Sequence, residues 1–146
     1  MTQKLHVRID EAASKIVIND GEKTFPDECC GFLFGLEENG ERKITLAQEV
    51  HNNKEGDKKR RFEIHPFDYM KAERYALEND LQLLGVYHSH PQHPAIPSEH
   101  DRVVAMPFFS YVIVSIIDGK LDDLRSYRLN DGKEFEEEAL ANVILS

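Results

Sequence analysis

The sequence contains no apolar run that approaches the roughly 18 residues typical of a membrane span. Its N-terminus, MTQKLHVRID, has no apolar stretch after the basic residue and therefore differs from a secretory signal peptide. Cysteine is scarce, and the adjacent positions of Cys29 and Cys30 exclude an ordinary disulfide framework and a two-cysteine zinc knuckle. We therefore expect a cytoplasmic protein with no membrane partner.

Positive charge is also in short supply. There are 18 Lys and Arg residues against 27 Asp and Glu residues, which gives a net charge of −9. Such a chain repels phosphate groups, so no nucleic-acid partner is expected. The 146 residues contain no repeat, low-complexity segment or linker, and we predict a single domain over residues 1–146. They carry no signal of an oligomeric state.

Apolar periodicity predicts an α/β fold with a curved, mixed, mostly antiparallel β-sheet flanked by helices. The helix that begins at Pro66 carries Phe67, Met70 and Leu77 on one face, with Leu81 beyond, and this face is expected to be buried. Strands are expected at residues 5–9, 29–36, 43–50, 62–64, 81–90, 111–117 and 121–129; helices are expected after Asp10 and from Pro66, and residues 134–145 form an edge strand or a helix.

Histidine is concentrated in one stretch. GVYHSHPQHPAIPSEHD, residues 85–101, holds four of the seven histidines of the chain. His88 and His90 lie at the end of a predicted strand, where residues two apart share a face and are about 6.6 Å apart. Two such imidazoles can converge on one ion, and Asp101 is the obvious third ligand. Three protein ligands with one open position are typical of a catalytic zinc site.

The end of this stretch also has a purely structural interpretation. Ser98 and Asp101 are spaced as in a capping box, the pattern that begins a helix. The two interpretations are compatible, because a helix that begins at Ser98 holds Asp101 in its first turn, facing the histidine strand. Asp101 alone does not decide between a helix cap and a metal ligand.

These residues resemble the JAMM family, also called MPN-plus, of zinc metalloproteases. Its pattern is an upstream glutamate, then His-x-His, seven residues, Ser, two residues and Asp; PDECCGFLFG and HSHPQHPAIPSEHD match it. The resemblance implies that His88, His90 and Asp101 bind Zn²⁺. It also implies that Glu28 is the general base and that Ser98 donates a hydrogen bond to the oxyanion. The fold that it implies is the JAMM/MPN fold, which is similar to that of cytidine deaminases.

The resemblance further implies an activity, hydrolysis of an amide or isopeptide bond by a zinc metalloprotease. Because the chain lacks room for long insertions, it resembles the small stand-alone prokaryotic members. Those members act at the C-terminal Gly-Gly tail of ubiquitin-like (β-grasp) proteins, including sulfur carriers, so such a carrier is the expected substrate and partner. Polar residues beside the cleft are implied at Asn52 or Asn53 and at Arg61.

Two other functions stay open. A non-catalytic scaffold of the MPN type shares the fold, although such scaffolds typically lose ligands that are all present here. A RadC-like, DNA-associated protein shares a similar His-x-His and Asp pattern, but the net charge of −9 and the context of Glu28 favour the protease. A zinc deaminase is disfavoured because its His-x-Glu and Pro-Cys-x-x-Cys motifs are absent.

Other residues near these motifs have simpler explanations. Cys29 and Cys30 are expected to be core residues of a strand and not nucleophiles. His93 and His100 are expected to be exposed, on a loop and on a helix turn; contact with the substrate or binding of adventitious metal is the alternative. The basic run KKRR, residues 58–61, is expected to be a solvated loop; contact with an acidic protein substrate is the alternative.

Overall fold

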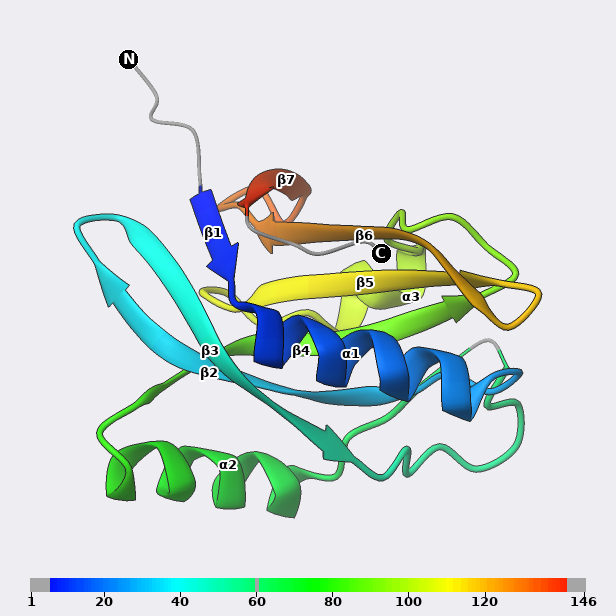
Figure 1. Ribbon diagram of the computed structural model, residues 1–146, viewed down its shortest axis with the longest axis horizontal. Coiled ribbons are helices and arrows are strands. Elements are labelled where there is room, and N and C mark those ends of the chain that lie inside the picture. Colours follow the sequence, from blue (N-terminus) through cyan, green and yellow to red (C-terminus); the bar gives the residue numbers. More distant parts are fainter. Residues whose placement is uncertain (1–5, 60, 142–146) are drawn as a thin grey trace.

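A computed structural model describes residues 6–59 and 61–141 of the chain (Figure 1). Most strands and the helices lie where the sequence predicts them. Residues 134–145 were predicted to form an edge strand or a helix, and the described part of this segment contains a strand. Residues 142–145 lie outside the described part. No helix within the described part is long and apolar enough to cross a membrane. The elements are β1 (His6–Ile9), α1 (Glu11–Thr24), β2 (Cys30–Glu38), β3 (Glu41–Val50), α2 (Pro66–Glu78), β4 (Gln82–Pro91), α3 (Glu99–Val104), β5 (Ser110–Ile117), β6 (Lys120–Leu129) and β7 (Phe135–Ala141).

The strands close into a barrel in the order β1-β3-β2-β4-β5-β6-β7, with β7 pairing back to β1. The pairs β1–β3, β1–β7 and β4–β5 are parallel, and the other neighbours are antiparallel. We expected an α/β fold with a curved, mixed, mostly antiparallel sheet flanked by helices. The strand pairing is mixed as expected, but the strands form a closed barrel and not a sheet flanked by helices, so the predicted fold is wrong. The sheet is a closed, mixed barrel that few helices accompany.

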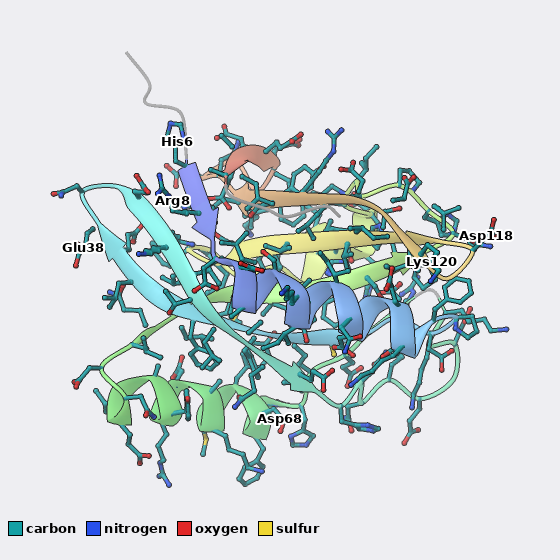
Figure 2. The ribbon with its side chains drawn as sticks, in the orientation of Figure 1. His6, Arg8, Glu38, Asp68, Asp118 and Lys120 are labelled. Atoms are coloured by element: carbon teal, nitrogen blue, oxygen red, sulfur yellow. The ribbon has the colours of Figure 1, made fainter. Side chains whose placement is uncertain are left out.

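β1 closes this barrel. One edge of β1 pairs with Glu41–Ile44 of β3, and the other edge pairs with Ala139–Ala141 of β7. Its side chains alternate, so that Val7 and Ile9 are buried while His6 and Arg8 point outward (Figure 2). Both pairings are parallel and join segments far apart in the sequence, so no hairpin turn marks them. For this reason the pattern of apolar residues did not predict the closure.

Two apolar layers lie on opposite faces of β2 and β4, one against α1 and the other against α2 (Figure 1). Alternate residues of a strand face opposite sides. Leu33 and Tyr87 therefore pack in the layer of α1, whereas Phe32 and Val86 pack in the layer of α2. The same alternation along β4 brings His88 to the side of α2.

The face of α2 that packs on the barrel is not the predicted one. Phe67, Met70 and Leu77 are 61%, 60% and 81% exposed. The buried residues of the helix are Ala72 and Ala76. Small alanines let the helix approach the aromatic surface of β2 closely, so the burial of the large apolar residues in α2 was predicted wrongly.

Residues 62–64 do not form the expected strand. Phe62 and Ile64 are nevertheless buried and belong to the apolar layer against α2. The alternation of these two apolar residues with the exposed Glu63 shows that one side of an extended segment is buried. It does not require a neighbouring strand.

Candidate metal centre

The two histidines of the HSH motif lie at the end of β4, between β2 and β5. Both imidazoles are buried, with 1% of His88 and 8% of His90 exposed. Ser89 faces the opposite side of the strand, where its Oγ accepts a hydrogen bond from the backbone N of Cys29 at 2.8 Å. β4 is thus tied to the start of β2 through one face and presents both histidines on the other.

Three predicted ligands come together here. Nε2 of His88 lies 3.1 Å from Nε2 of His90. Oδ2 of Asp101 lies 3.3 Å from the first of these atoms and 3.2 Å from the second. Ligand atoms placed tetrahedrally around Zn²⁺, each about 2.0–2.1 Å from the ion, are about 3.3 Å apart. The three atoms therefore fit three corners of a zinc tetrahedron.

Neighbouring groups hold both imidazole rings in place. Nδ1 of His90 lies 2.9 Å from the carbonyl oxygen of Pro94 and donates its hydrogen to it, so the Nε2 lone pair faces Asp101. The ring of His88 stacks on Phe62 with 4.5 Å between centroids. Burial lowers the pKa of His88, although Asp101 opposes this shift. Neutral imidazole is the form that binds a metal ion.

The contacts to Pro94 and Phe62 were not predicted. The first uses a backbone carbonyl, which every residue possesses, and the second uses the face of a ring. Neither carries a sequence motif. The single signal in the sequence for the stacking of Phe62 on His88 was the position of Phe62, an aromatic residue directly after the polar loop.

Asp101 reaches the histidines from the first turn of α3. Oγ of Ser98 accepts a hydrogen bond from the backbone N of Asp101 at 3.0 Å, and Oδ2 of Asp101 accepts one from the backbone N of Ser98 at 2.8 Å. The capping box is therefore complete, and the oxygen that closes it also faces the histidines. Burial raises the pKa of Asp101, but His88, His90 and the Ser98 amide outweigh it and hold the pKa well below its usual range.

Glu28 lies just before β2 and is 5% exposed. Burial, and then the negative charges of Asp101 and Asp57, raise the pKa of Glu28 to about 9, while Arg61 acts in the opposite direction. A buried acid with so perturbed a pKa, beside three residues that could together hold a metal ion, is typical of a functional site.

Asn52 ties the loop of residues 51–61 to Glu28. Its Nδ2 donates to the carbonyl oxygens of Glu28 at 3.1 Å and Arg61 at 3.2 Å, and its Oδ1 accepts from two backbone amides at 3.0 Å each. Asn52 is buried, whereas Asn53 is exposed. The sequence left the choice between these two residues open, because adjacent residues of one type carry the same signal.

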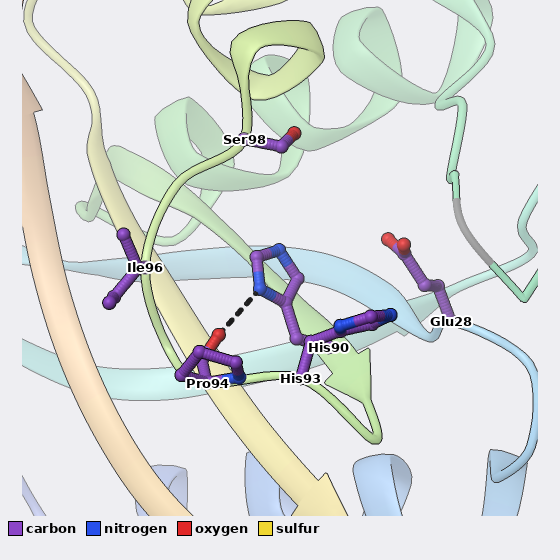
Figure 3. A pocket seen from close by; sticks show the side chains of 6 residues that line it. All are labelled: Glu28, His90, His93, Pro94, Ile96 and Ser98. Carbon is purple, nitrogen blue, oxygen red and sulfur yellow. Dashed lines mark hydrogen bonds between the residues drawn. The ribbon is translucent and has the colours of Figure 1, made fainter.

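A pocket of about 440 Å³ opens beside this cluster (Figure 3). Ser98 is exposed at this pocket, and because its Oγ accepts from the Asp101 amide, the orientation of its hydroxyl is constrained. A hydroxyl that accepts one hydrogen bond keeps its own hydrogen to donate. The residues that line the pocket are Glu28, His90, His93, Pro94, Ile96 and Ser98.

Of the two histidines that were expected to be exposed, His93 is exposed and His100 is not. His93 lines the pocket, whereas His100 is half-buried, and its Nδ1 lies 3.1 Å from an Nη1 of Arg61. In the KKRR run, Arg60 lies outside the described residues, and Lys59 and Arg61 are exposed. The run is thus largely on the surface, as predicted.

Cys29 and Cys30 are both free thiols and both buried. Burial raises the pKa of Cys29 well above its ordinary value and that of Cys30 to about 12. Neither is a ready nucleophile, because the thiolate is the reactive form. The prediction that both are core residues is confirmed.

Residues 10–130 match the family described as prokaryotic homologs of the JAB domain. The chain belongs to this family. The match confirms the family resemblance that was inferred from Glu28 and the HSH motif.

Relatives of the JAB-domain chain include proteins named for cleavage. This chain is 30% identical over 124 residues to the CysO-cysteine peptidase of Mycobacterium tuberculosis. The aligned part covers 83% of this chain and 81% of that protein. The chain is 36% identical over 74 residues to a desampylase of Pyrococcus furiosus, 51% of this chain and 49% of that protein. A probable TtuB-protein conjugate cleaving protease of Thermus thermophilus is 36% identical over 69 residues, 47% of this chain and 43% of that protein.

Two solution structures resemble the fold. A protein from Desulfitobacterium hafniense has a TM-score of 0.82 at 24% identity and covers 93% of this chain and 92% of its own. A protein from Salinibacter ruber has a TM-score of 0.68 at 33% identity, with 92% of this chain and 90% of its own covered. The first likeness supports the fold alone.

Proposed function

We propose that this chain is a zinc-dependent peptidase that hydrolyses an amide bond at the C-terminal tail of a ubiquitin-like sulfur-carrier protein. The observation that carries the proposal is the convergence of one oxygen and two nitrogens, from Asp101, His88 and His90, within 3.3 Å of one another. The buried Glu28 lies at the same pocket as His90. Peptidase activity is supported by the names of the relatives.

The donor set supports zinc as the metal. Neutral imidazole nitrogen and carboxylate oxygen are both ligands of Zn²⁺, and three protein ligands leave one position open. His88, His90 and Asp101 would hold the ion. A zinc ion in such a site supplies a water of lowered pKa and polarises the carbonyl group of the substrate.

Glu28 is proposed to take the proton of the attacking water and to deliver it to the leaving amine. With its pKa at about 9, the carboxyl group holds a proton at neutral pH even though Arg61 acts in the opposite direction. After burial, the largest cause of this pKa is the negative charge of Asp101. Positive charge bound at Asp101 removes that cause, so the pKa of Glu28 falls and its ionised form can act as the base.

Ser98 is proposed to donate its hydroxyl hydrogen to the oxyanion that forms when the amide carbon becomes tetrahedral. The backbone amide of Asp101, at 3.0 Å from Oγ, restricts the rotation of this hydroxyl. Donors of this kind contribute about 3 kcal/mol in comparable sites. Ser98 therefore serves both the helix and the reaction.

The pocket suits a narrow, extended tail. Pro94 and Ile96 form an apolar wall opposite the side chain of Glu28 (Figure 3). Residues without side chains, as in a Gly-Gly tail, allow a peptide carbonyl to approach buried histidines closely. The names CysO-cysteine peptidase and TtuB-protein conjugate cleaving protease support a substrate of this class.

The test combines zinc analysis with cleavage of a ubiquitin-like carrier that bears an extension after its Gly-Gly tail. We expect the wild type to hold one zinc per chain and to release the extension, detected by mass spectrometry. Glu28→Gln keeps zinc and loses at least about 100-fold in kcat, since general bases contribute that much. His88→Ala loses both zinc and activity.

His6→Ala is the matched control, because His6 is an exposed histidine on β1 that does not line the pocket. It is expected to retain zinc and activity. Normal turnover by Glu28→Gln would exclude Glu28 as the base. A wild type that binds zinc but cleaves no carrier would favour an MPN-type scaffold over a peptidase.

A further inference from the structure

Arg61 is an exposed cation beside the metal centre that pairs with no acid of the described chain. Other arginines form ion pairs with glutamates, among them Arg42, Arg102 and Arg128. The guanidinium group of Arg61 has five N–H donors, and its one side-chain contact within the described residues, to His100, uses Nη1. Donors therefore remain for an anion that arrives from solvent.

The backbone of Arg61 is held next to that of Glu28. Nδ2 of Asn52 donates to the carbonyl oxygens of both residues, at 3.2 Å for Arg61 and 3.1 Å for Glu28. Two oxygens that accept from one nitrogen lie at most about 6 Å apart. The backbone N of Glu28 also donates to the carbonyl oxygen of Lys58, at 2.6 Å. Arg61 is therefore fixed relative to Glu28 by contacts at both ends of the same short segment.

The side chain of Arg61 reaches the helix that carries Asp101. Its Nη1 donates to Nδ1 of His100 at 3.1 Å, and the imidazole is the acceptor because arginine has donors only. His100 directly precedes Asp101 in the first turn of α3. The positive charge of Arg61 also acts on Glu28, where it opposes the rise in the pKa of the carboxyl group. The guanidinium group thus stands beside the metal centre, on the side of Glu28.

Glu28 also determines where the leaving group departs. In the proposed reaction it delivers a proton to the leaving nitrogen, which must therefore come within hydrogen-bond reach of its carboxyl group. The apolar wall of Pro94 and Ile96, against which the carrier tail packs, lies opposite Glu28 (Figure 3). In a leaving α-amino acid, the carboxyl carbon is about 2.5 Å from the nitrogen. Its carboxylate is then released on the side where Arg61 stands.

A carboxylate that departs beside Glu28 needs a cation close by. The negative charges of Asp101 and Asp57 already raise the pKa of Glu28, so they also repel a further anion there. A guanidinium group can hold a carboxylate with two parallel N–H···O bonds, which an ammonium group cannot. Within the described chain, no contact of Arg61 uses Nε or Nη2. Arg61 can therefore offer this edge of its guanidinium group to the carboxylate.

We propose that Arg61 binds the free α-carboxylate of the released residue, so that the chain removes a single C-terminal amino acid from the carrier tail. The inference rests on the proposed function, because it takes the same metal centre and the same carrier. The amide bond before the last residue breaks, the hydroxyl of water joins the acyl carbon, and the proton of water passes through Glu28 to the amine. An isopeptide-linked lysine is the contrasting leaving group, because the carbon next to its ε-amine carries no carboxylate.

The test compares two carriers that differ in one group. Each bears one residue after its Gly-Gly tail, which ends in a free carboxylate in the acid carrier and in a carboxamide in the amide carrier. The wild type is expected to cleave the acid carrier with a kcat/KM about 10- to 100-fold higher, the range for hydrogen bonds to a charged group. Arg61→Gln is expected to abolish this preference.

Control variants separate recognition from the effect of charge on Glu28. Arg61→Gln also removes a positive charge that acts on Glu28, but that change slows both carriers alike and leaves their ratio unaltered. Arg61→Lys keeps the charge and loses the paired bonds, so an intermediate preference is expected. Lys59→Gln removes another exposed cation of the same loop, and Arg74→Gln removes an exposed arginine of α2. Both are expected to keep the ratio of the wild type.

Affinity gives a second readout that requires no turnover. In the Glu28→Gln background, the acid carrier is expected to bind about 10- to 100-fold more tightly than the amide carrier, and adding Arg61→Gln is expected to erase the difference. The inference is overturned by equal Kd values for the two carriers, by an Arg61→Gln variant that keeps the preference, or by faster cleavage of an isopeptide-linked carrier. A wild type that holds zinc and cleaves no carrier would instead refute the proposed function, while the Kd values still decide the role of Arg61.

Discussion

Glu28 is a buried acid whose ionisation depends on its surroundings. Its folded pKa is about 9, compared with an ordinary value of 4.5, so the folded state holds the proton more tightly than the unfolded state does. The stability contributed by Glu28 is therefore present below about pH 4.5 and is lost as the pH rises toward 9.

In metal-free protein, Glu28→Gln is expected to flatten the pH dependence of stability. Between pH 5 and 9 the free energy of unfolding of the wild type falls relative to that of the variant, because only the wild type acquires a buried charge. Urea unfolding in the presence of a chelator measures both curves. Parallel curves for the two proteins would contradict the raised pKa of Glu28.

The sequence located His88, His90 and Asp101 because their spacing is itself the signal. Two residues that are two apart on a strand share a face, and a capping box places its acid in the first helical turn. Glu28 has no such local signal, and the family resemblance alone pointed to it. Asn52 has no local signal either, since its role depends on four hydrogen bonds that form only in the folded chain.

At the scale of the element, α3 begins at a residue with two proposed roles. Ser98→Ala removes the acceptor for the Asp101 amide, so the free energy of unfolding is expected to fall by about 1 kcal/mol. It also removes the oxyanion donor, so kcat is expected to fall about 10²- to 10³-fold. Ser98→Thr keeps a hydroxyl and serves as the control. A loss of stability without a loss of kcat would exclude the oxyanion role.

The helix α2 allows a matched test of its orientation. Leu77 is 81% exposed, whereas its neighbour Ala76 is buried. Leu77→Gln is expected to change the free energy of unfolding by less than about 0.5 kcal/mol. Ala76→Gln forces a polar side chain into the packed face and is expected to cost about 2 kcal/mol. Chemical unfolding measures both, and the opposite order would restore the predicted apolar face.

The packed face of α2 escaped prediction for a physical reason. Periodicity reports where apolar residues lie on a helix, but the surface of the partner decides which of them fit. Phe32 and Phe34 of β2 already fill the layer against α2, and their rings pack against Tyr69 and Tyr75 of the helix. Little volume is left between these rings, which alanines can occupy.

At the scale of the whole molecule, closure depends on a strand of four residues. Ile9→Ala leaves a cavity where β1 joins β3 and is expected to lower the free energy of unfolding by about 2–5 kcal/mol. His6→Ala, on the exposed side of β1, is expected to have little effect. Thermal and urea unfolding provide the comparison. Equal stability of both variants would show that β1 adds nothing to the barrel.

The hairpin of β2 and β3 was predictable, because the turn at Glu38-Asn39-Gly40 joins its strands directly. The closure was not, since β1 and β7 lie at opposite ends of the chain and pair in parallel. The pairing of β1 with β7 depends on the curvature of the whole sheet, to which all the other strands contribute. Local patterns therefore recovered most of the elements and missed the closure of the barrel.

The shared oxygen of Asp101 has a consequence for local motion. To release its amide hydrogen to solvent, Ser98 must break its bond to Oδ2, the atom that also faces the histidines. An ion held by that oxygen opposes the fraying of the first turn of α3, so deuterium uptake at the Ser98 amide slows with occupancy. A single resonance in an isotope-exchange spectrum would then report how full the centre is, without any substrate.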